Sequence, residues 1–419
     1  MKKILLGTTT LIGAASIFAG AALADTPKVT VGGYANFEAG YQDDTLNGRS
    51  PTGTYTGTYL DQRAQAFRSD TQVDFKIDGK NEAGLGYGGE VDLLADTTAD
   101  VQGRGVNASK TFVYVDGNWG RFELGSNVGA DGTLKVDAGT IARATGGVNG
   151  DWSYFANAHD QFLAQAALPL AYGNVGTQNG ISSANYLGDH TEENINKITY
   201  YTPRWQGLQV GVSYLPDQTN TGQGSVAFNG PNRTDELAGL ASNIWSAGIN
   251  YDNKFGDFGI ALAATGEYGK SQLATYEDLK AWNAGAKVSY MGFSLAGSYG
   301  DWGKSETLTA DNSKKTYYWD LGAAYEYGPF GASVTYLNST VDCGTAITGA
   351  GINAGCLAAD AGHKNKFDSI STGVDYKLAP GLTPYAEVTW YNEKVGTPVA
   401  ATNPNNDGYV IIVGTQLNF

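Results

Sequence analysis

The final stretch of the chain, GYVIIVGTQLNF (residues 408–419), alternates strictly between two kinds of side chain. A period of two is the side-chain repeat of a β-strand. Aromatic residues stand at both ends of the apolar face, and aromatic girdles about 25 Å apart are what a membrane-spanning barrel strand requires. The stretch therefore predicts a strand of a transmembrane β-barrel. Its apolar face consists of Tyr409, Ile411, Val413, Thr415, Leu417 and Phe419.

The same alternation recurs along the chain and predicts sixteen strands. Their connections alternate between short turns and long loops, which is the asymmetry of an outer-membrane barrel with periplasmic turns and extracellular loops. A closed antiparallel barrel leaves no unpaired sheet edge in the lipid. The expected strands lie near 28–42, 67–78, 83–95, 108–116, 119–126, 194–203, 207–216, 241–252, 257–267, 279–290, 292–301, 315–327, 329–338, 366–378, 382–392 and 408–419.

Residues 1–24 have the pattern of a secretory signal peptide. Two lysines precede an apolar stretch from Ile4 to about Phe18, and an Ala-Leu-Ala sequence at 22–24 supplies the cleavage site. The apolar stretch is short and interrupted by Gly and Thr, which disfavours a membrane anchor. We therefore expect residues 25–419 to form a single exported barrel domain.

Composition supports an exported, all-β protein and argues against a nucleic-acid-binding function. The 58 glycines disfavour helices and the 26 tyrosines favour strands. Removing Lys2 and Lys3 with the signal peptide takes the net charge from -15 to -17, so a nucleic-acid partner is not expected. In an exported chain, Cys343 and Cys356 are expected to form a disulfide that closes one loop, and no metal site is expected there.

The sequence gives little support for an enzyme. His159, His190 and His363 lie in predicted loops without metal-ligand spacing, and no catalytic serine or zinc motif is found. The stretch GLGYGG (84–89) matches the dinucleotide fingerprint G-x-G-x-x-G, but it falls in the third predicted strand and opens no helix. We expect its inward glycines to leave width in the channel or room for a loop.

The connection from Asn127 to Glu193 is unusually long, and loops of this length are commonly functional. It is either an extracellular loop without a special role or a segment that folds into the lumen, because a sixteen-stranded barrel is too wide for wall side chains to fill. In the second case its acids would face bases on the wall. The candidate constriction acids are Asp131, Asp137 and Asp151, and the candidate wall bases are Arg68, Lys76, Lys110 and Arg121.

Three features resemble the general diffusion porins of the Gram-negative outer membrane. They are NINKITYYTPRWQGLQVGVSYLPD (194–217), GRFELGSNVGADGTLKVDAGT (120–140) and the terminal Phe419. The resemblance implies a sixteen-stranded homotrimer in the outer membrane, a constricting third loop, and passive diffusion of small hydrophilic solutes and ions without a cofactor. Some relatives bind calcium between loop carboxylates, although no EF-hand spacing is found here.

The acidic excess predicts a weak preference for cations. Two alternatives stay open at this point. Inward aromatic residues such as Tyr34 and Tyr201 suggest a substrate-specific channel, for example for sugars. Long loops would also suit a surface adhesin or phage receptor built on a closed barrel.

Overall fold

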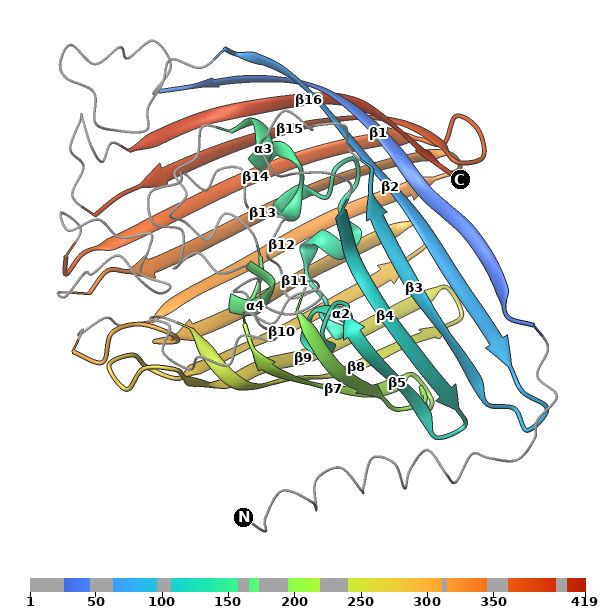
Figure 1. Cartoon of the computed structure of the whole chain (residues 1–419). Coiled ribbons are helices and arrows are strands. Elements are labelled where there is room, and N and C mark those ends of the chain that lie inside the picture. The colour runs from blue at the N-terminus through green and yellow to red at the C-terminus, as the bar shows by residue number, and fades with distance from the viewer. Residues whose placement is uncertain are drawn as a thin grey trace.

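Sixteen strands close into a single antiparallel barrel in a computed structural model of the chain (Figure 1). The structure describes residues 26–45, 63–95, 107–156, 166–172, 195–218, 240–310, 315–344, 361–396 and 405–419. The predicted signal peptide, His159, His190 and Cys356 lie outside these residues. Within them, no helix has both the length and the apolar character needed to cross a bilayer.

Every predicted strand is confirmed, and each pairs with its neighbours in the chain. The strands are β1 (Lys28–Asp44), β2 (Gln65–Lys80), β3 (Gly86–Leu94), β4 (Asn107–Gly117), β5 (Gly120–Ser126), β6 (Asn196–Tyr201), β7 (Leu208–Asp217), β8 (Ala241–Phe255), β9 (Phe258–Ser271), β10 (Leu279–Tyr290), β11 (Phe293–Gly303), β12 (Thr316–Tyr327), β13 (Phe330–Asp342), β14 (Lys364–Tyr376), β15 (Leu382–Lys394) and β16 (Asn406–Asn418).

The short helices of the described residues all follow β5 and precede β6. They are α2 (Ala130–Leu134), η2 (Ala138–Ile141), η3 (Gly147–Asn149), α3 (Trp152–Phe155) and α4 (Pro169–Tyr172). None exceeds five residues, which is too short for a helix to be stable without tertiary contacts. Their positions must therefore be set by what they pack against.

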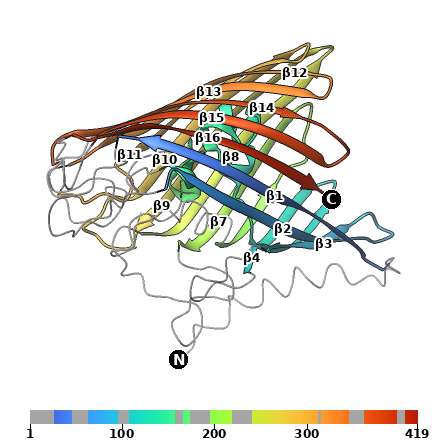
Figure 2. The ribbon, with the colours of Figure 1, turned by 90° about the horizontal axis from the view of Figure 1, so that it is seen from above.

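The two ends of the sheet meet at β1 and β16, which run side by side in both views (Figures 1 and 2). The pairing continues to the last residue of the chain. The amide of Phe419 donates to the carbonyl of Gly33 at 3.1 Å, and the amide of Gly33 donates to the carbonyl of Phe419 at 3.2 Å. The terminal residue thus completes the barrel wall.

The wall has two chemically different faces, as the period-two pattern predicts. On β13, Phe330 is 60% exposed and Val334 is 46% exposed. Ser333 and Thr335, which flank Val334 and point to the opposite face, are buried. We call these the outer apolar face and the polar face. Aromatic pairs flank the outer apolar face at both strand ends, for example Phe330 with Tyr376 at 4.6 Å near the short turns and Tyr214 with Trp245 at 5.0 Å near the long loops.

The GLGYGG stretch is part of β3, and its glycines make room for neighbouring side chains. Gly88 lies between Asp78 on β2 and Tyr114 on β4, and the Tyr114 hydroxyl crosses it to bond the Asp78 carboxylate. A Cβ on Gly88 would stand 2.7 Å from that hydroxyl, and one on Gly86 would stand 2.6 Å from the Asp116 carboxylate. The expectation of open width or loop space is therefore corrected at Gly86 and Gly88, where cross-strand side chains occupy the space, while a Cβ on Gly84 would meet nothing within 4 Å.

Candidate functional site

The candidate site is the long connection between β5 and β6, whose described residues 127–156 and 166–172 we call the loop segment. Figure 1 shows its helices α2 and α3 among the strands of the barrel. Its contacts with the barrel fall on the polar face of strands far apart around the wall, from β7 to β2.

The first anchor joins α2 to β7 and β8. The amide of Ala130 donates to Ser213 Oγ at 2.9 Å, and the amide of Asp131 donates to Ser246 Oγ at 3.2 Å. The Ser246 hydroxyl bonds the Asp131 carboxylate in return. These bonds satisfy amides at the helix N-terminus that have no partner within the helix. Asp131 is 2% exposed, so its carboxylate faces the wall instead of water.

The second anchor joins η2 to β12. The amide of Ala138 donates to Asp320 Oδ1 at 2.7 Å. Asp137 is 2% exposed, pairs with Lys135 at 2.7 Å and accepts the amide of Thr140 at 3.1 Å as a helix cap. Asp137, like Asp131, thus serves the conformation of the loop segment and does not present an acidic surface to solvent.

The third anchor is Arg143. Its guanidinium forms a bidentate pair with Asp375 on β14, at 2.7 and 2.8 Å, and a further pair with Glu326 on β12 at 2.8 Å. Its amide donates to Ser333 Oγ on β13 at 2.8 Å. A planar guanidinium suits such a fork, and one residue thereby binds three consecutive strands.

The fourth anchor is Glu387 on β15, which is 1% exposed. Its carboxylate accepts the hydroxyl of Thr145 at 2.8 Å and the amides of Thr145 and Gly147 at 3.2 and 3.4 Å. Charged acceptors bind amide donors more strongly than neutral acceptors do. This anchor fixes the turn that leads into η3.

A row of wall glycines lets the backbone of the loop segment lie directly on the polar face. A Cβ on Gly285 of β10 would stand 1.7 Å from the carbonyl oxygen of Val136, and one on Gly373 of β14 would stand 2.7 Å from the carbonyl oxygen of Arg143. Contacts this short cannot exist, so any larger residue must displace the loop segment. Further members of the row, which we call the glycine track, are Gly248 and Gly322, together with Gly331 and Gly40, which leave room for the side chains of Arg143 and Phe155.

Trp152 in α3 is the largest side chain of the loop segment and is fully buried. Its ring stacks on Phe367 of β14 at 5.8 Å and on Tyr391 of β15 at 6.0 Å. Its indole N–H donates to the carbonyl oxygen of Gly147 at 3.0 Å. The indole therefore connects η3, α3 and the wall in one apolar cluster.

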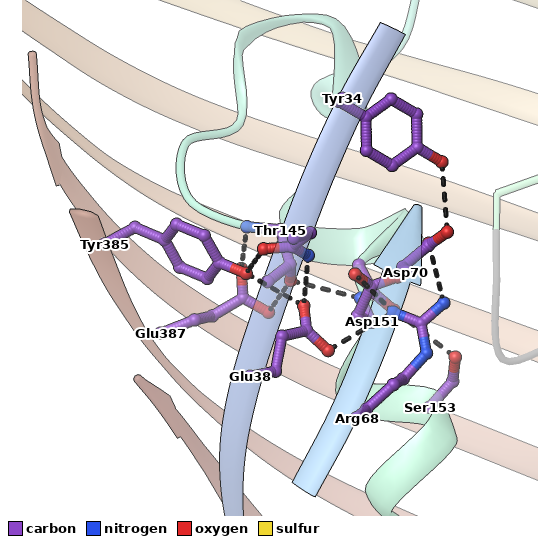
Figure 3. Close-up of polar contacts among 11 residues, drawn as sticks. Tyr34, Glu38, Arg68, Asp70, Thr145, Asp151, Ser153, Tyr385 and Glu387 are labelled. Atoms are coloured by element: carbon purple, nitrogen blue, oxygen red, sulfur yellow. Dashed lines mark hydrogen bonds and ion pairs between the residues drawn. The ribbon is translucent and has the colours of Figure 1, made fainter. Parts of the chain in front are cut away.

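The last anchor joins α3 to β1 and β2 at Arg68 (Figure 3). The guanidinium pairs with Glu38 at 3.2 Å, with Asp70 at 2.8 Å and with Asp151 of the loop segment at 3.1 Å. The ring of Tyr154 covers it, 4.0 Å from the guanidinium carbon. We call these five residues the Arg68 cluster.

The other predicted wall bases also lie on the polar face, but their described ion pairs are with acids of the wall. Lys76 pairs with Glu90 at 3.7 Å, and Lys110 pairs with Asp92 at 3.3 Å. Arg121 pairs with Glu123 at 2.7 Å and stacks on Tyr114 at 3.7 Å. Among the described ion pairs, Asp151 with Arg68 is the one that joins a predicted loop acid to a predicted wall base.

Two further expectations concern cysteine and metal chemistry. Cys343 at the end of β13 is disulfide-bonded, while Cys356 lies outside the described residues. No group of three or more His, Cys, Asp or Glu side chains in the described part of the chain is arranged to hold a metal ion.

Sequence reasoning missed the wall residues that hold the loop segment, namely Asp320, Asp375, Glu387 and the glycine track. The acids had a usable signal, because each stands on the polar side of its strand's alternation. The glycines had none beyond composition, since which of them meets the loop segment depends on the path of that segment in space.

Comparison with known proteins gives a consistent result. The family profile described as "Gram-negative porin" matches residues 8–396. An uncharacterized protein of Rickettsia bellii is 28% identical over the full length of both chains, and one of Rickettsia conorii is 29% identical over 75% of this chain and 76% of its own.

Solved structures of the same fold cover 94% of this chain and 100% of their own. An anion-selective porin from Comamonas acidovorans has a TM-score of 0.56 at 16% identity. A loop-deletion mutant of OmpT, an outer membrane protein of Vibrio cholerae, has a TM-score of 0.53 at 11% identity. At these identities the likeness concerns the fold.

Proposed function

The chain belongs to the Gram-negative porin family, and we propose that its channel passes small hydrophilic solutes and ions with a weak preference for cations. The family makes it a non-enzymatic diffusion channel, a β-barrel of the Gram-negative outer membrane. The outer apolar face then contacts lipid and the polar face lines the channel. What supports the cation preference is the charge on the polar face.

Acids outnumber bases on the polar face of β2 to β5. Each of the three bases beyond Arg68 pairs with one acid of the wall, which leaves the remaining acids as an excess of negative charge. In a narrow water-filled pore such an excess raises the local concentration of cations. The acids are Asp70, Asp74, Asp78, Glu90, Asp92, Asp116 and Glu123, and the bases are Arg68, Lys76, Lys110 and Arg121.

We infer that the loop segment narrows this channel. It bonds to the polar faces of β8, β13 and β2, which lie at separate points around a closed barrel. A segment that follows these polar faces around the inside of a closed barrel takes up part of the space that the wall encloses. The constriction would then pair Asp151 with Arg68, while Asp131 and Asp137 hold the segment in shape.

A KCl gradient across a planar bilayer tests the selectivity. We expect a reversal potential of the sign that indicates cation preference, reduced in Asp74→Asn and increased in Lys76→Gln, which changes the neighbouring charge on the same face of β2. Glu306→Gln, at a buried carboxyl outside the loop segment, is the control and should leave the potential unchanged. An anion-selective current, or equal potentials in the first two variants, would contradict the proposal.

Swelling of liposomes in sugars of increasing size distinguishes this function from that of a sugar-specific channel. We expect uptake that falls steeply with solute size and does not saturate with concentration. Tyr201 is 7% exposed and donates to Thr133 Oγ1 at 3.0 Å, and Tyr34 donates to Asp70 at 3.2 Å, so both hydroxyls are engaged by protein groups. Saturable uptake of one sugar would favour the specific channel, and the lack of a steady ion current would favour an adhesin or receptor.

We propose that the assembled channel is a homotrimer, with β5 and β6 in the contact region. β5 has 7 residues and β6 has 6, so at about 3.3 Å per residue and a tilt of about 45° they span roughly 16 Å, less than the apolar band of about 25 Å. The hydroxyls of Ser69 and Thr111 also lie on the outer apolar face nearby. Lipid solvates neither feature well, whereas another protomer would.

The mass of the protein–detergent complex measures this assembly directly. We expect three chains per particle in a mild detergent, and monomers in Leu124→Arg, which places a charge on the exposed side of β5. Ile370→Arg, at an equally exposed position on the distant strand β14, is the matched control and should remain trimeric. A monomeric native protein would refute the proposal.

A further inference from the structure

We propose that Arg68 is the positioning residue for the α3 end of the loop segment, and that Asp151 makes this attachment dependent on pH. The inference rests on the proposed function, because movement of the loop segment is detected as a change in channel current. It goes beyond that function by identifying where and under which condition the constriction is released.

The α3 end is attached by a different kind of contact from the α2 and η2 anchors. At α2 and η2, the side chains of Ser213, Ser246 and Asp320 accept backbone amides, so these bonds do not depend on a charge carried by the segment itself. At α3, Asp151 of the segment pairs with Arg68 of β2 and hydrogen-bonds with Glu38 of β1, and the Tyr154 ring covers the guanidinium. A change in the charge of Asp151 therefore acts directly on this attachment.

The wall half of the Arg68 cluster is preorganised (Figure 3). Glu38 is fully buried and accepts Asn36 Nδ2 at 3.1 Å and the hydroxyl of Tyr385 at 3.0 Å. Asp70 accepts the hydroxyl of Tyr34 at 3.2 Å. These bonds hold both wall carboxylates beside Arg68 whether or not the loop segment is attached, so Asp151 always enters a site that already contains two acids.

One guanidinium faces three carboxylates, so full ionisation leaves the Arg68 cluster with excess negative charge. The groups that face Asp151 are Glu38 from β1, Arg68 and Asp70 from β2, and Tyr385 from β15, while Glu387 is reached through Thr145. Burial and the hydrogen bond with Glu38 raise the pKa of Asp151 to about 8, against the attraction of Arg68. The attached loop segment thus holds a proton that binds Glu38 and Asp151 together.

The direction of the pH effect follows from linkage. A detached Asp151 would titrate near the ordinary aspartate pKa of 3.8, whereas the attached residue titrates near 8. The attached state therefore binds the proton more tightly. Attachment is strongest below about pH 4, weakens as the pH rises toward 8, and changes no further above it.

Single-channel recording at pH 5, 7 and 9 tests the inference. A detached α3 end is free to enter the channel cross-section, so we expect brief closures of the native channel to become about tenfold more frequent or more between pH 5 and pH 9. Asp151→Asn keeps a hydrogen-bond donor but cannot ionise, and its closure rate should be independent of pH. Arg68→Gln should close frequently at every pH, and Arg68→Lys should restore part of the native pattern.

Arg121→Gln is the matched control. Arg121 also pairs with a carboxylate and stacks on a tyrosine ring, but Glu123 and Tyr114 are both wall residues. Its closures should retain the native rate and pH profile, although its ion selectivity changes. A native pH profile in Asp151→Asn, or equal closure rates in Arg121→Gln and Arg68→Gln, would overturn the inference. Native protein without any channel current would instead contradict the proposed function.

Discussion

Gly285→Ala is expected to displace the loop segment from the wall although it adds a single methyl group. The new Cβ would stand 1.7 Å from the carbonyl oxygen of Val136, and that oxygen belongs to backbone that cannot rotate away as a side chain can. Overpacking of a well-packed site costs about 1–3 kcal/mol, which corresponds to a population of the displaced segment about tenfold higher or more. Single-channel conductance and trypsin cleavage after the adjacent Lys135 measure this displacement.

Gly259→Ala provides the matched control for this substitution. Gly259 is on the polar face of the neighbouring strand β9, but a Cβ there would meet the flexible hydroxyl of Ser289 at 2.4 Å and no part of the loop segment. We expect native conductance and native cleavage kinetics. If Gly285→Ala behaved in the same way, the glycine track would have no role in positioning the loop segment.

Trp152→Ala is expected to release the α3 region with the largest energetic effect of any single substitution in the loop segment. Truncation removes the stacking on Phe367 and Tyr391 and the indole hydrogen bond to Gly147, and it leaves a cavity between the segment and the wall. Comparable truncations of buried tryptophan cost about 3–5 kcal/mol. When opening is fast relative to cleavage, proteolysis follows the opened population, so chymotrypsin cleavage after Tyr154 in α3 should accelerate by about a hundredfold or more.

Trp152→Phe separates packing from hydrogen bonding. Phenylalanine retains most of the stacking area and loses the indole N–H, so the cost should be about 1 kcal/mol and the cleavage rate should rise only about fivefold. Cleavage at the native rate in Trp152→Ala would show that the α3 region is held by other contacts. The free energy of unfolding of the barrel itself should change little in either variant, because the strand pairing is untouched.

Most of the fold was predictable because each strand carries its own signal. Alternation along residues 408–419 and 366–378 assigns a face to every residue without reference to any partner, and short turns fix which strand comes next. Parity predicted that Lys76, Lys110 and Arg121 point inward, and the strand registers place these residues on the polar face. Local chemistry sufficed for these features because a barrel wall is built from contacts between neighbours in the chain.

The candidate site was less predictable because its contacts join residues far apart in sequence. Asp131 and Asp137 were selected because they are acids in a long loop. In the structure, Asp131 bonds Ser246 of β8 and Asp137 pairs with Lys135 of the same loop, and both acids are buried. Gly88 suggested free width, but the tyrosine opposite it fills the space. The sequence identified each residue, while the neighbour that gives Asp131 or Gly88 its role came from another strand.

The sequence by itself determined the number of strands, the two faces of the wall and the membership of the chain among proteins that cross a membrane with strands. These properties follow from the pleat of a β-strand and from the lipid, which act on each segment separately. Only the tertiary structure decided the path of the loop segment. That path depends on where the wall lacks side chains, as at Gly285, and on where Asp375, Glu387 and Arg68 present charged groups to the segment. Such positions become neighbours only after the barrel has closed.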